Sequence, residues 1–496
     1  MALILSTERD LPWDLSAEEV WQVYNGLDCA ITHQVLSNLR PLLTKQTGAI
    51  YKFQMELQVL AIEMMQRGLR VNAEEKAKAI KFLDAGIAKL DKMIERYALA
   101  IWKKPLNPKS HHQLKDLLYE WMKLPKQYKY EKGERKLTSN RTALEKLVYY
   151  YDATALIKAL MAHADARELL KVLNKELAHD GRMRFSYNVG ATETGRWSSS
   201  VHPLGSGTNG QNITDEIRRI FEPDPGFIFL NFDLVTAESL GVAYFSGDAA
   251  YKDACRSGDL HTLVARMVWR ELAWTGDLKR DRGIADQPFY RHFTYRDMAK
   301  RGGHLSNYLG TARTMAMHLH LPQSVCTDFQ ELYFEAFPGI PLWHVEVQAE
   351  LQLNKKLITP LGRVRHFFGR LDEKETLKEA IAFLPQSTIV DVINKGALKL
   401  WKQYKWVQFL MQVHDSILIQ VPISKLGDTL DFADSLDIAV PIRGEEMHIP
   451  VECAVGFNWG KRLWNKETKS FENPRGLYKV NNAELLELAR RLSTLD

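Results

Sequence analysis

Two aspartates stand at the ends or tips of apolar, strand-like segments. Asp233 follows GFIFLNF at residues 226–232, and Asp415 interrupts LMQVHDSILIQVP at residues 410–422. Two carboxylates that meet in one sheet would repel each other, and a hard cation with oxygen ligands removes that conflict. Two Mg²⁺ ions about 4 Å apart can activate one oxygen and stabilise another as it leaves. The pair therefore indicates metal-assisted phosphoryl transfer.

Each segment also has a simpler interpretation. Asp233 can be the N-cap of a helix over TAESLGV, residues 236–242. His414, Asp415 and Ser416 can be the polar turn of an ordinary hairpin, because Asp and Ser side chains bond to nearby backbone. Neither segment alone decides between structure and chemistry.

A third segment, YRDMAKRGGHLSNYLG at residues 295–310, carries polar side chains at every fourth position: Arg296, Lys300, His304 and Tyr308. This spacing places them on one stripe of a helix. The stripe is either a solvated basic face or a surface on which a triphosphate docks, with a base near Tyr308. Gly302 and Gly303 cost helix stability, which suggests that something approaches closely there.

Composition limits the classes of protein. The chain has 496 residues with a net charge of +5, so a core of several domains and an anionic partner are both compatible with it. Its four cysteines form no CxxC pair, which argues against a zinc site and a disulfide framework. We see no signal peptide and no run of 18 apolar residues, and we expect a cytoplasmic protein of a bacterium or a phage-infected host.

The remaining chain must position these residues. Helical spacing covers residues 52–102, 107–124, 142–178 and most of 255–355, with Ser110 as a cap. Strand-like segments lie at 226–232, 357–369, 410–422 and 448–459, the last of which we expect to be the final strand. Residues 123–141 read as a basic loop, either solvated or tracking a phosphate backbone, and the tail ends in an amphipathic helix. The pattern predicts an α+β fold.

Seven motifs, in order, resemble those of the family A DNA polymerases, the DNA polymerase I family. They are TGRWSSS with GQNIT, FDLVTAESLGVAYFSGD, GDLHTLVA, RDMAKRGGHLSNYLG, AFLPQSTIVDVI, QVHDSILIQVP and VECAVGFNW, and the resemblance covers about residues 50–463. It implies a right-hand polymerase fold, with an antiparallel palm sheet and helical fingers and thumb. It also implies template-directed 5′–3′ DNA synthesis from dNTPs on a primer–template.

The resemblance assigns roles by position. It implies two Mg²⁺ ions, which Mn²⁺ can replace, on Asp233 and Asp415, with Lys300 as general acid toward pyrophosphate. The implied dNTP site is Glu238, His261, Arg296, Lys300, His304 and Tyr308, in which Glu238 excludes a 2′-hydroxyl. The implied primer and template contacts are Arg196, Gln211, Asn212, Gln386, His414 and Ser416.

Four positions depart from the family pattern. Ser416 stands where the family has Glu, which leaves a third carboxylate ligand unsupported. His304 replaces Phe or Tyr beside the incoming sugar, and Ala382 replaces an Asn. Leu309 separates Tyr308 from Gly310.

The implied domains are an exonuclease remnant at 1–45, a thumb at 46–174, a palm at 175–254 and 356–463, fingers at 255–355 and an extension at 464–496. Tyr24 and Asp28 in YNGLDCAITHQVL match the last exonuclease motif, while the upstream motifs are missing. We therefore expect no proofreading by this chain: either a separate exonuclease is a partner, or the lineage has lost this activity. The texture of RDMAKRGGHLSNYLG resembles phage enzymes, which favours a phage-type lineage with a separate exonuclease, and a processivity factor is a further candidate partner.

Two alternatives remain open. Phage-type single-subunit RNA polymerases share an HDS motif and a Lys…Tyr helix, but a ribonucleotide enzyme needs a small residue at the position of Glu238. A non-catalytic nucleic-acid-binding relative would be expected to lose Asp233, Asp415 or Lys300, and all three are present.

Overall fold

The computed structural model describes residues 16–131, 133–148, 150, 153–202, 207–290 and 293–494. The N-terminal segment for which we expect no signal peptide, residues 1–15, lies outside them. The chain forms two compact units, Met1–Phe53 and Gln54–Asp496. In the described part of the chain, no helix is both long and apolar enough to cross a membrane.

The first unit is helical. Ser16 caps helix α2 (Ala17–Leu39) through a capping box with Glu19, and a short 3₁₀ turn, η1 (Arg40–Leu42), follows. Helix α3 (Lys45–Arg67) begins in this unit and ends in the second. Tyr24 and Asp28, the two residues that match an exonuclease motif, lie on α2, which buries none of its residues.

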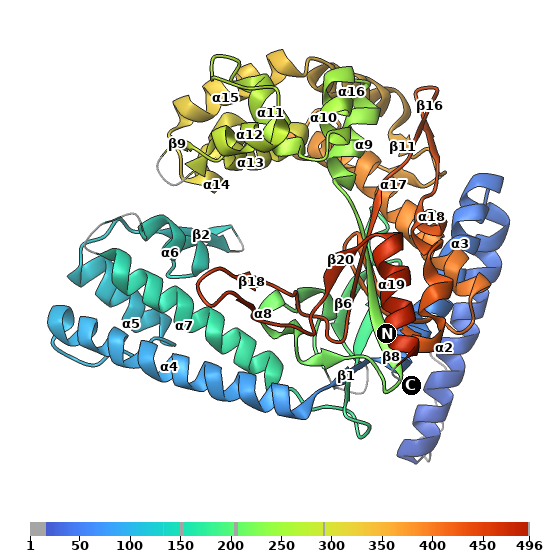
Figure 1. Ribbon diagram of the computed structural model, residues 1–496, viewed down its shortest axis with the longest axis horizontal. Helices are drawn as coiled ribbons and strands as arrows, with labels where there is room; N and C mark the ends of the chain where they lie inside the picture. Colours follow the sequence, from blue (N-terminus) through green and yellow to red (C-terminus); the bar gives the residue numbers. More distant parts are fainter. Residues whose placement is uncertain are drawn as a thin grey trace, which may run out of the picture. The chain divides into compact units, whose positions relative to one another are not determined.

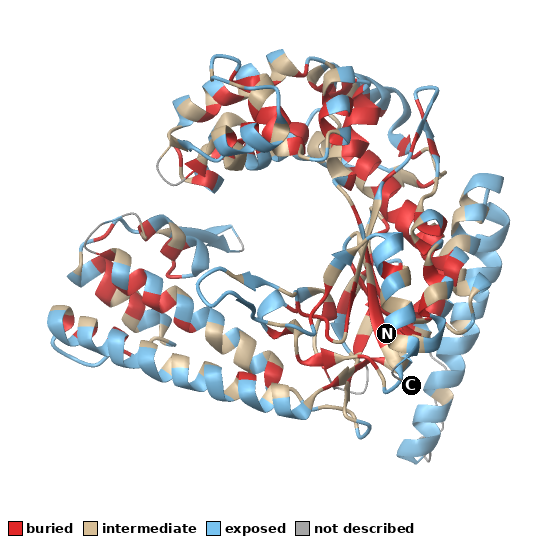
Figure 2. Cartoon of the chain, viewed as in Figure 1, coloured by how far each residue is buried: buried red, intermediate tan, exposed pale blue. Residues whose placement is uncertain are grey.

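A five-stranded antiparallel sheet, which includes β8 and β20, lies at the centre of the second unit (Figure 1). Its strand order is β13-β14-β8-β17-β20. Its strands are β8 (Phe227–Leu234), β13 (Gln408–Val413), β14 (Ser416–Pro422), β17 (Val451–Gly456) and β20 (Tyr478–Val480). The middle of β8 is buried, as its continuous apolar run predicts, and Figure 2 shows the buried residues gathered along these strands. The predicted strand at 226–232 and the predicted hairpin at 410–422 are confirmed.

Helices cover one face of this sheet. Phe232 of β8 contacts Phe432 of α18 (Phe432–Leu436), and α18 packs on α17 (Lys374–Gln403). Asp233 is the next residue along β8 and therefore lies on the opposite face of the sheet, where it is exposed to solvent.

A helical block surrounds the stripe at residues 295–310 and confirms the predicted helical region. Its helices are α9 (Ala237–Ser246), α10 (Ala249–Arg256), α11 (Leu260–Val268), α12 (Leu278–Ala285), α13 (Tyr295–Asn307), α14 (Ala312–Leu319), α15 (Gln323–Ala336) and α16 (Gly339–Asn354). Two short strands, β9 (Pro288–Tyr290) and β10 (Phe293–Thr294), precede α13. The block is tied to α17 through α9 and α16.

A second helical group is built on α4 (Ala73–Trp102) and α7 (Thr154–Leu173), which pack along each other. Helix α5 (His111–Lys115), a π-helical turn η2 (Asp116–Trp121) and α6 (Arg141–Leu147) complete its core. Ser110 caps α5 by accepting from the Gln113 amide at 3.3 Å, as predicted. The expected loop at 123–141 is wrong in part: β2 (Tyr128–Glu131) and β3 (Glu134–Leu137) form a hairpin there, with Lys132 outside the described residues.

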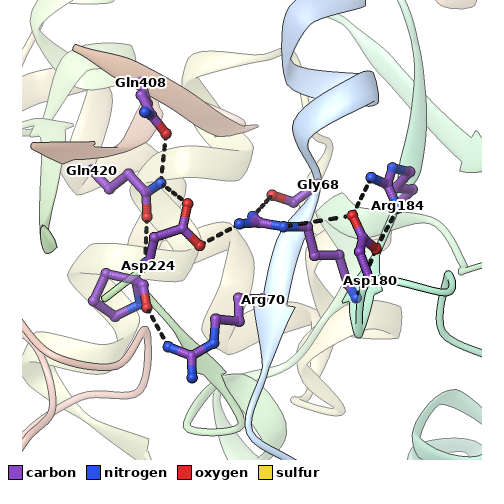
Figure 3. A network of polar contacts seen from close by, with 9 residues as sticks. Gly68, Arg70, Asp180, Arg184, Asp224, Gln408 and Gln420 are labelled. Carbon is purple, nitrogen blue, oxygen red and sulfur yellow. Dashed lines mark hydrogen bonds and ion pairs between the residues drawn. The ribbon is translucent and has the colours of Figure 1, made fainter. Parts of the chain in front are cut away.

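A small sheet in the order β4-β1-β7 joins this group to the central sheet. It consists of β1 (Leu69–Val71), β4 (Arg182–Met183) and β7 (Phe221–Glu222). Asp224 accepts from Gln420 of β14 at 2.7 Å and pairs with Arg182, which also donates to the Gly68 carbonyl (Figure 3). These contacts fix the start of β8 against segments that are distant in sequence.

The remaining elements are short. They are β5 (Phe185–Asn188), β6 (Ser198–Val201), the turn η4 (Gly210–Asn212), α8 (Asp215–Arg218), β11 (Lys356–Ile358), β12 (Val364–His366), η5 (Ile423–Thr429), β15 (Val440–Ile442) and β16 (Glu445–Met447). The hairpin β11–β12 confirms the strand expected at 357–369. All four cysteines are free.

The expectation that residues 448–459 form the last strand is wrong. After β17 the chain forms β18 (Trp464–Asn465) and β19 (Ser470–Phe471), then β20, which pairs with β17 at the edge of the central sheet. The predicted amphipathic helix follows as α19 (Asn482–Ser493) and packs on η5. A strand as short as β20 has too few residues to show a periodic pattern. Its place in the sheet depends on the free edge of β17.

A buried ion pair supports the loop that precedes β6. Arg363 donates to Asp391 of α17 at 2.6 and 3.1 Å, and Asp391 is fully buried. Gly195, with φ +79°, passes so close that a Cβ there would lie 2.5 Å from the Arg363 guanidinium carbon. The pair therefore holds the TGR segment, and with it Arg196, near α17.

We expect Asp391→Ala to destabilise the protein by about 3–5 kcal/mol, because it leaves the Arg363 charge buried and unpaired. The double variant Arg363→Met/Asp391→Leu removes both charges and should cost less than the single variant. Urea unfolding measures both. A single variant within about 1 kcal/mol of the parent would contradict a buried, structural pair.

Candidate active site

The hairpin β13–β14 presents Asp415 at its tip. His414 and Asp415 form the two-residue turn, and His414 takes the left-handed conformation with φ +56°. The amide of Leu234 donates to the Asp415 carbonyl at 3.2 Å, so the tip is bonded to the end of β8. The hairpin interpretation and the site interpretation of residues 410–422 are therefore compatible.

Asp233 is a residue of β8, not a helix cap. Thr236 holds the N-cap position of α9 and makes no side-chain cap bond. Asp233 lies directly between Ser416 of β14 and Glu452 of β17 in the sheet register. The Ser416 hydroxyl donates to the Val413 carbonyl at 2.9 Å, which turns it toward its own hairpin. The structure therefore places Asp233 near the end of β8, beside the turn that carries Asp415 and leads into the neighbouring strand β14.

The electrostatics of this spot disfavour two ionised carboxylates. Although part of Asp233 is exposed, the protein atoms around its carboxyl partly desolvate it, and this desolvation, together with the charges of Asp415 and Glu452, raises the pKa of Asp233 to about 6. Burial and the charge of Glu238 raise the pKa of Asp415. Among the described residues, no group of three or more His, Cys, Asp or Glu side chains could hold a metal ion. Mg²⁺ needs only one or two carboxylates when waters and substrate phosphates complete its shell, so this pair fits it.

The raised pKa of Asp233 predicts that the stability of the folded protein depends on pH. The folded pKa of about 6 is above the value of an unfolded Asp, about 3.9, so the folded state binds this proton more tightly. That stability is complete below the unfolded pKa and is lost as pH rises through about 6. We expect metal-free Asp233→Asn to melt at a higher temperature than the parent at pH 8, with the difference shrinking toward pH 4.

The matched control is Asp253→Asn, which changes an exposed carboxylate on α10. Thermal unfolding of the three proteins from pH 4 to pH 8 makes the comparison. A pH-independent difference between Asp233→Asn and the parent would contradict the raised pKa.

Glu238, on the first turn of α9, lies beside three predicted site residues. Arg196 forms an ion pair with it, the Tyr308 hydroxyl donates to it at 3.5 Å, and His304 Nδ1 lies 3.8 Å from it. Arg196, Glu238, His414 and Asp415 line one open cavity of about 330 Å³. Glu238 is therefore held beside the hairpin tip at a fixed position.

The basic stripe lies on α13 as predicted, except that Tyr308 is the residue just after the helix. Lys300 and His304 are exposed, and Arg296 donates to Asp259 at 3.0 Å. Burial and the nearby charges of Arg296 and Lys300 lower the pKa of His261 to about 4, so its imidazole is neutral at pH 7. The structure thus brings His261, Arg296 and Lys300 together.

Sequence reasoning missed two residues that position this helix. Asp259 is the N-cap of α11 and also orients Arg296, and it stands inside the quoted GDLHTLVA motif. Asn307 is buried at the end of α13, where it donates to Tyr251 at 2.9 Å and accepts from Tyr333 at 2.8 Å. A polar residue directly before Tyr308 was the available signal.

The two glycines of α13 have a packing reason. A Cβ on Gly302 would lie 2.5 Å from the Phe329 ring, and one on Gly303 would lie 3.1 Å from the Tyr333 ring. Both rings belong to α15. The close approach expected at these glycines is therefore to a helix of the same block.

The residues predicted to contact primer and template differ in their exposure and in their hydrogen bonds. Gln211 donates to the carbonyl and side-chain oxygens of Gln412 at 3.3 and 3.1 Å, and Asn212 is exposed. Gln386 is half-buried on α17, next to Pro385, which packs closely on Gly241 of α9. Arg196 forms an ion pair with Glu238.

The chain is similar in sequence to known DNA polymerases. The family model described as "DNA polymerase family A" matches residues 77–461. Curated relatives named "DNA polymerase I, thermostable" from Thermus filiformis and Thermus aquaticus are 26% and 25% identical to the chain, over 86% and 88% of its length. "DNA polymerase I" of Deinococcus radiodurans is 26% identical over 88%. The chain spans 50%, 52% and 45% of these relatives, about half their length.

A solved structure has a similar fold. It is described as the "POL domain of Pol1 from M. smegmatis complex with DNA primer-template and dNTP". The TM-score is 0.68 at 22% sequence identity, and the match covers 82% of this chain and 69% of that chain. The expected α+β right-hand fold is thereby confirmed. With a family model matched over most of its length, the chain belongs to DNA polymerase family A.

Proposed function

We propose that this chain carries out template-directed 5′–3′ DNA synthesis, transferring a nucleotide from a dNTP to a primer 3′-hydroxyl and releasing pyrophosphate. The observation that carries the proposal is the placement of Asp233 near the end of β8 and of Asp415 in the turn before the adjacent strand β14, with the Leu234 amide donating to the Asp415 carbonyl. The family membership supports the reaction class.

We propose Asp233 and Asp415 as the residues that hold two Mg²⁺ ions. Desolvation and neighbouring carboxylates raise the pKa of each carboxyl, and a bound cation would favour the ionised forms. When bound, such ions lower the pKa of a hydroxyl and neutralise developing charge in phosphoryl transfer. Mn²⁺ accepts the same oxygen ligands and can substitute.

The dNTP side of the site is formed by α11 and α13. Arg296, oriented by Asp259, would bind the triphosphate, and neutral His261 would donate a hydrogen bond to it. Lys300 is exposed and near both residues, so it can give a proton to the leaving pyrophosphate. His304 and Tyr308 would border the sugar and base.

The nucleic-acid side is proposed to include Arg196, Gln211, Asn212, Gln386, His414 and Ser416. We propose a thumb at 46–174, a palm at 175–254 and 356–463, and fingers at 255–355, with 464–496 as an extension. In this arrangement the basic hairpin β2–β3 would contact the duplex backbone, which positions DNA without reading its sequence.

We also propose that these 496 residues do not proofread and that the lineage is phage-type. Tyr24 and Asp28 on α2 are the only residues for which sequence resemblance suggests an exonuclease role. A separate exonuclease or a processivity factor would then act as a partner.

The test is extension of a labelled primer–template with Mg²⁺, run with dNTPs, with rNTPs and with no nucleotide. Extension with dNTPs alone is expected, with an intact primer in the third lane. Extension with rNTPs would indicate an RNA polymerase, and absence of activity would indicate a binding relative. Primer shortening would overturn the proposal on proofreading.

A further inference from the structure

The segment 462–479, which we call the C-terminal strap, lies beyond the residues that match the family model. It contains five basic residues and two acidic ones. The strap includes the hairpin β18–β19 and ends in β20. Its charge is a large part of the net charge of the whole chain, which is +5.

The strap is attached firmly to the catalytic sheet. Strand β20 pairs with β17, and the Leu477 amide donates to the Gly460 carbonyl at 2.7 Å. Asn458 and Asn473 exchange two bonds of 2.8 Å. A Cβ on Gly476 would lie 2.4 Å from the side-chain nitrogen of Asn473 and from the Gly460 carbonyl. The strap therefore has one position relative to Asp233.

An open cavity of about 410 Å³ connects the strap to the candidate active site. Asp233 and Ser416 line one part of it, and Trp459, Lys461, Arg462 and Lys479 line another. Asp233, Ser416 and Glu452 share one face of the sheet, so the cavity lies on the face that carries the proposed metal ligand. It is distinct from the cavity that contains Glu238 and Asp415.

Some cations of this surface are already paired, and others are available. Lys461 bonds to Asp215 at 2.6 Å, and Lys479 pairs with Glu452. Lys466 and Lys469 are exposed in the turn of the hairpin, and no ion pair joins either to a described residue. These two lysines can therefore accept an external anion.

Aromatic rings pack against another cation of the strap, Arg462. The Arg462 guanidinium lies 4.4 Å from the Phe471 ring centre and 3.9 Å from that of Tyr478. Trp464 and Phe471 are paired across β18–β19 in an edge-to-face contact with ring centres 5.0 Å apart, and they are 54% and 38% exposed. Exposed aromatic faces among cations suit the sugars and phosphates of a nucleic acid.

We propose that the turn and strands of the strap hairpin, residues 462–471, bind the sugar-phosphate backbone of the primer strand behind its 3′ end. This inference rests on the proposed function, in which Asp233, as a metal ligand, would place the primer terminus at the mouth of the cavity. The anion nearest along the same face of the sheet is then the primer backbone. A protein partner fits less well, since lysine is depleted at protein interfaces.

The test removes the two free charges without changing the fold. In Lys466→Ser/Lys469→Asn, asparagine suits the left-handed backbone of Lys469, where φ is +49°. The matched control is Arg490→Gln/Arg491→Gln, which removes two exposed charges from α19 of the same C-terminal region. Anisotropy titrations across a salt series measure the Kd of primer–template, of single-stranded template and of duplex without an overhang.

We expect the strap variant to raise the Kd for both duplex substrates about tenfold near 0.1 M salt and to lower the salt slope by about two. The control should match the parent, and single-nucleotide incorporation at saturating DNA should be unchanged. Equal Kd values for parent and variant, or a loss confined to single strands, would overturn the proposal. Because these titrations need no catalysis, an inactive parent would refute the proposed function without deciding this one.

Pyrophosphate is the other anion that could enter the cavity. Product inhibition by pyrophosphate should be the same in the parent and the strap variant. Weaker inhibition in the variant, with unchanged duplex binding, would assign the cations to the product and contradict the primer-strand site.

Discussion

Replacement of Asp233 or Asp415 by alanine is expected to abolish nucleotide incorporation and to leave primer–template binding nearly unchanged. Each carboxylate is proposed to hold ions that neutralise charge in the transition state, so the loss should be at least about 10³-fold, or roughly 4 kcal/mol. DNA affinity depends mainly on cations along the backbone, which neither substitution removes. Single-turnover incorporation at saturating DNA and dNTP measures the effect.

Asp253→Ala provides the control, since it removes an exposed carboxylate on α10. The raised pKa of Asp233 gives a second readout. The carboxylate must be ionised to bind a cation, so activity of the parent should fall as pH drops through about 6, and more Mg²⁺ should move that fall to lower pH. Retained synthesis in either alanine variant would refute the two-metal assignment.

Glu238→Ala is expected to admit ribonucleotides. Glu238 is fixed by Arg196 and Tyr308 on the first turn of α9, in the cavity that contains Asp415. Its side chain would therefore occupy the space that a 2′-hydroxyl needs. Removal of that side chain should reduce discrimination between dNTP and rNTP by about 10²-fold, measured as the ratio of kcat/KM values.

Tyr308→Phe tests whether the Tyr308 hydroxyl positions Glu238, apart from the space that the Glu238 side chain fills. It keeps the ring and removes the hydroxyl that donates to Glu238, so Glu238 would be held less firmly and discrimination should fall by a smaller factor. Glu350→Ala, at an exposed position of α16, is the matched control. Unchanged selection in Glu238→Ala would remove this residue from the gate role.

Local sequence patterns determined the elements that carry the candidate site. The apolar run of β8, the two apolar runs around the polar turn at residues 410–422 and the four-residue spacing of α13 depend on side chains close in sequence, and all three elements are present. The order of the polymerase-like motifs also indicated the fold before any contact was known. These signals are local, or are carried by residue types alone.

Only the tertiary structure decided how these elements meet. Asp259 orients Arg296 across 37 residues, and Arg196 pairs with Glu238 across 42. Gly302 and Gly303 are explained by aromatic rings of α15, and β20 joins the sheet although three residues carry no reliable periodicity. Such contacts depend on side chains and strand edges that are far apart in the chain. A local pattern therefore predicts that a strand or helix exists, whereas its partner is selected by packing and hydrogen bonding in the folded protein.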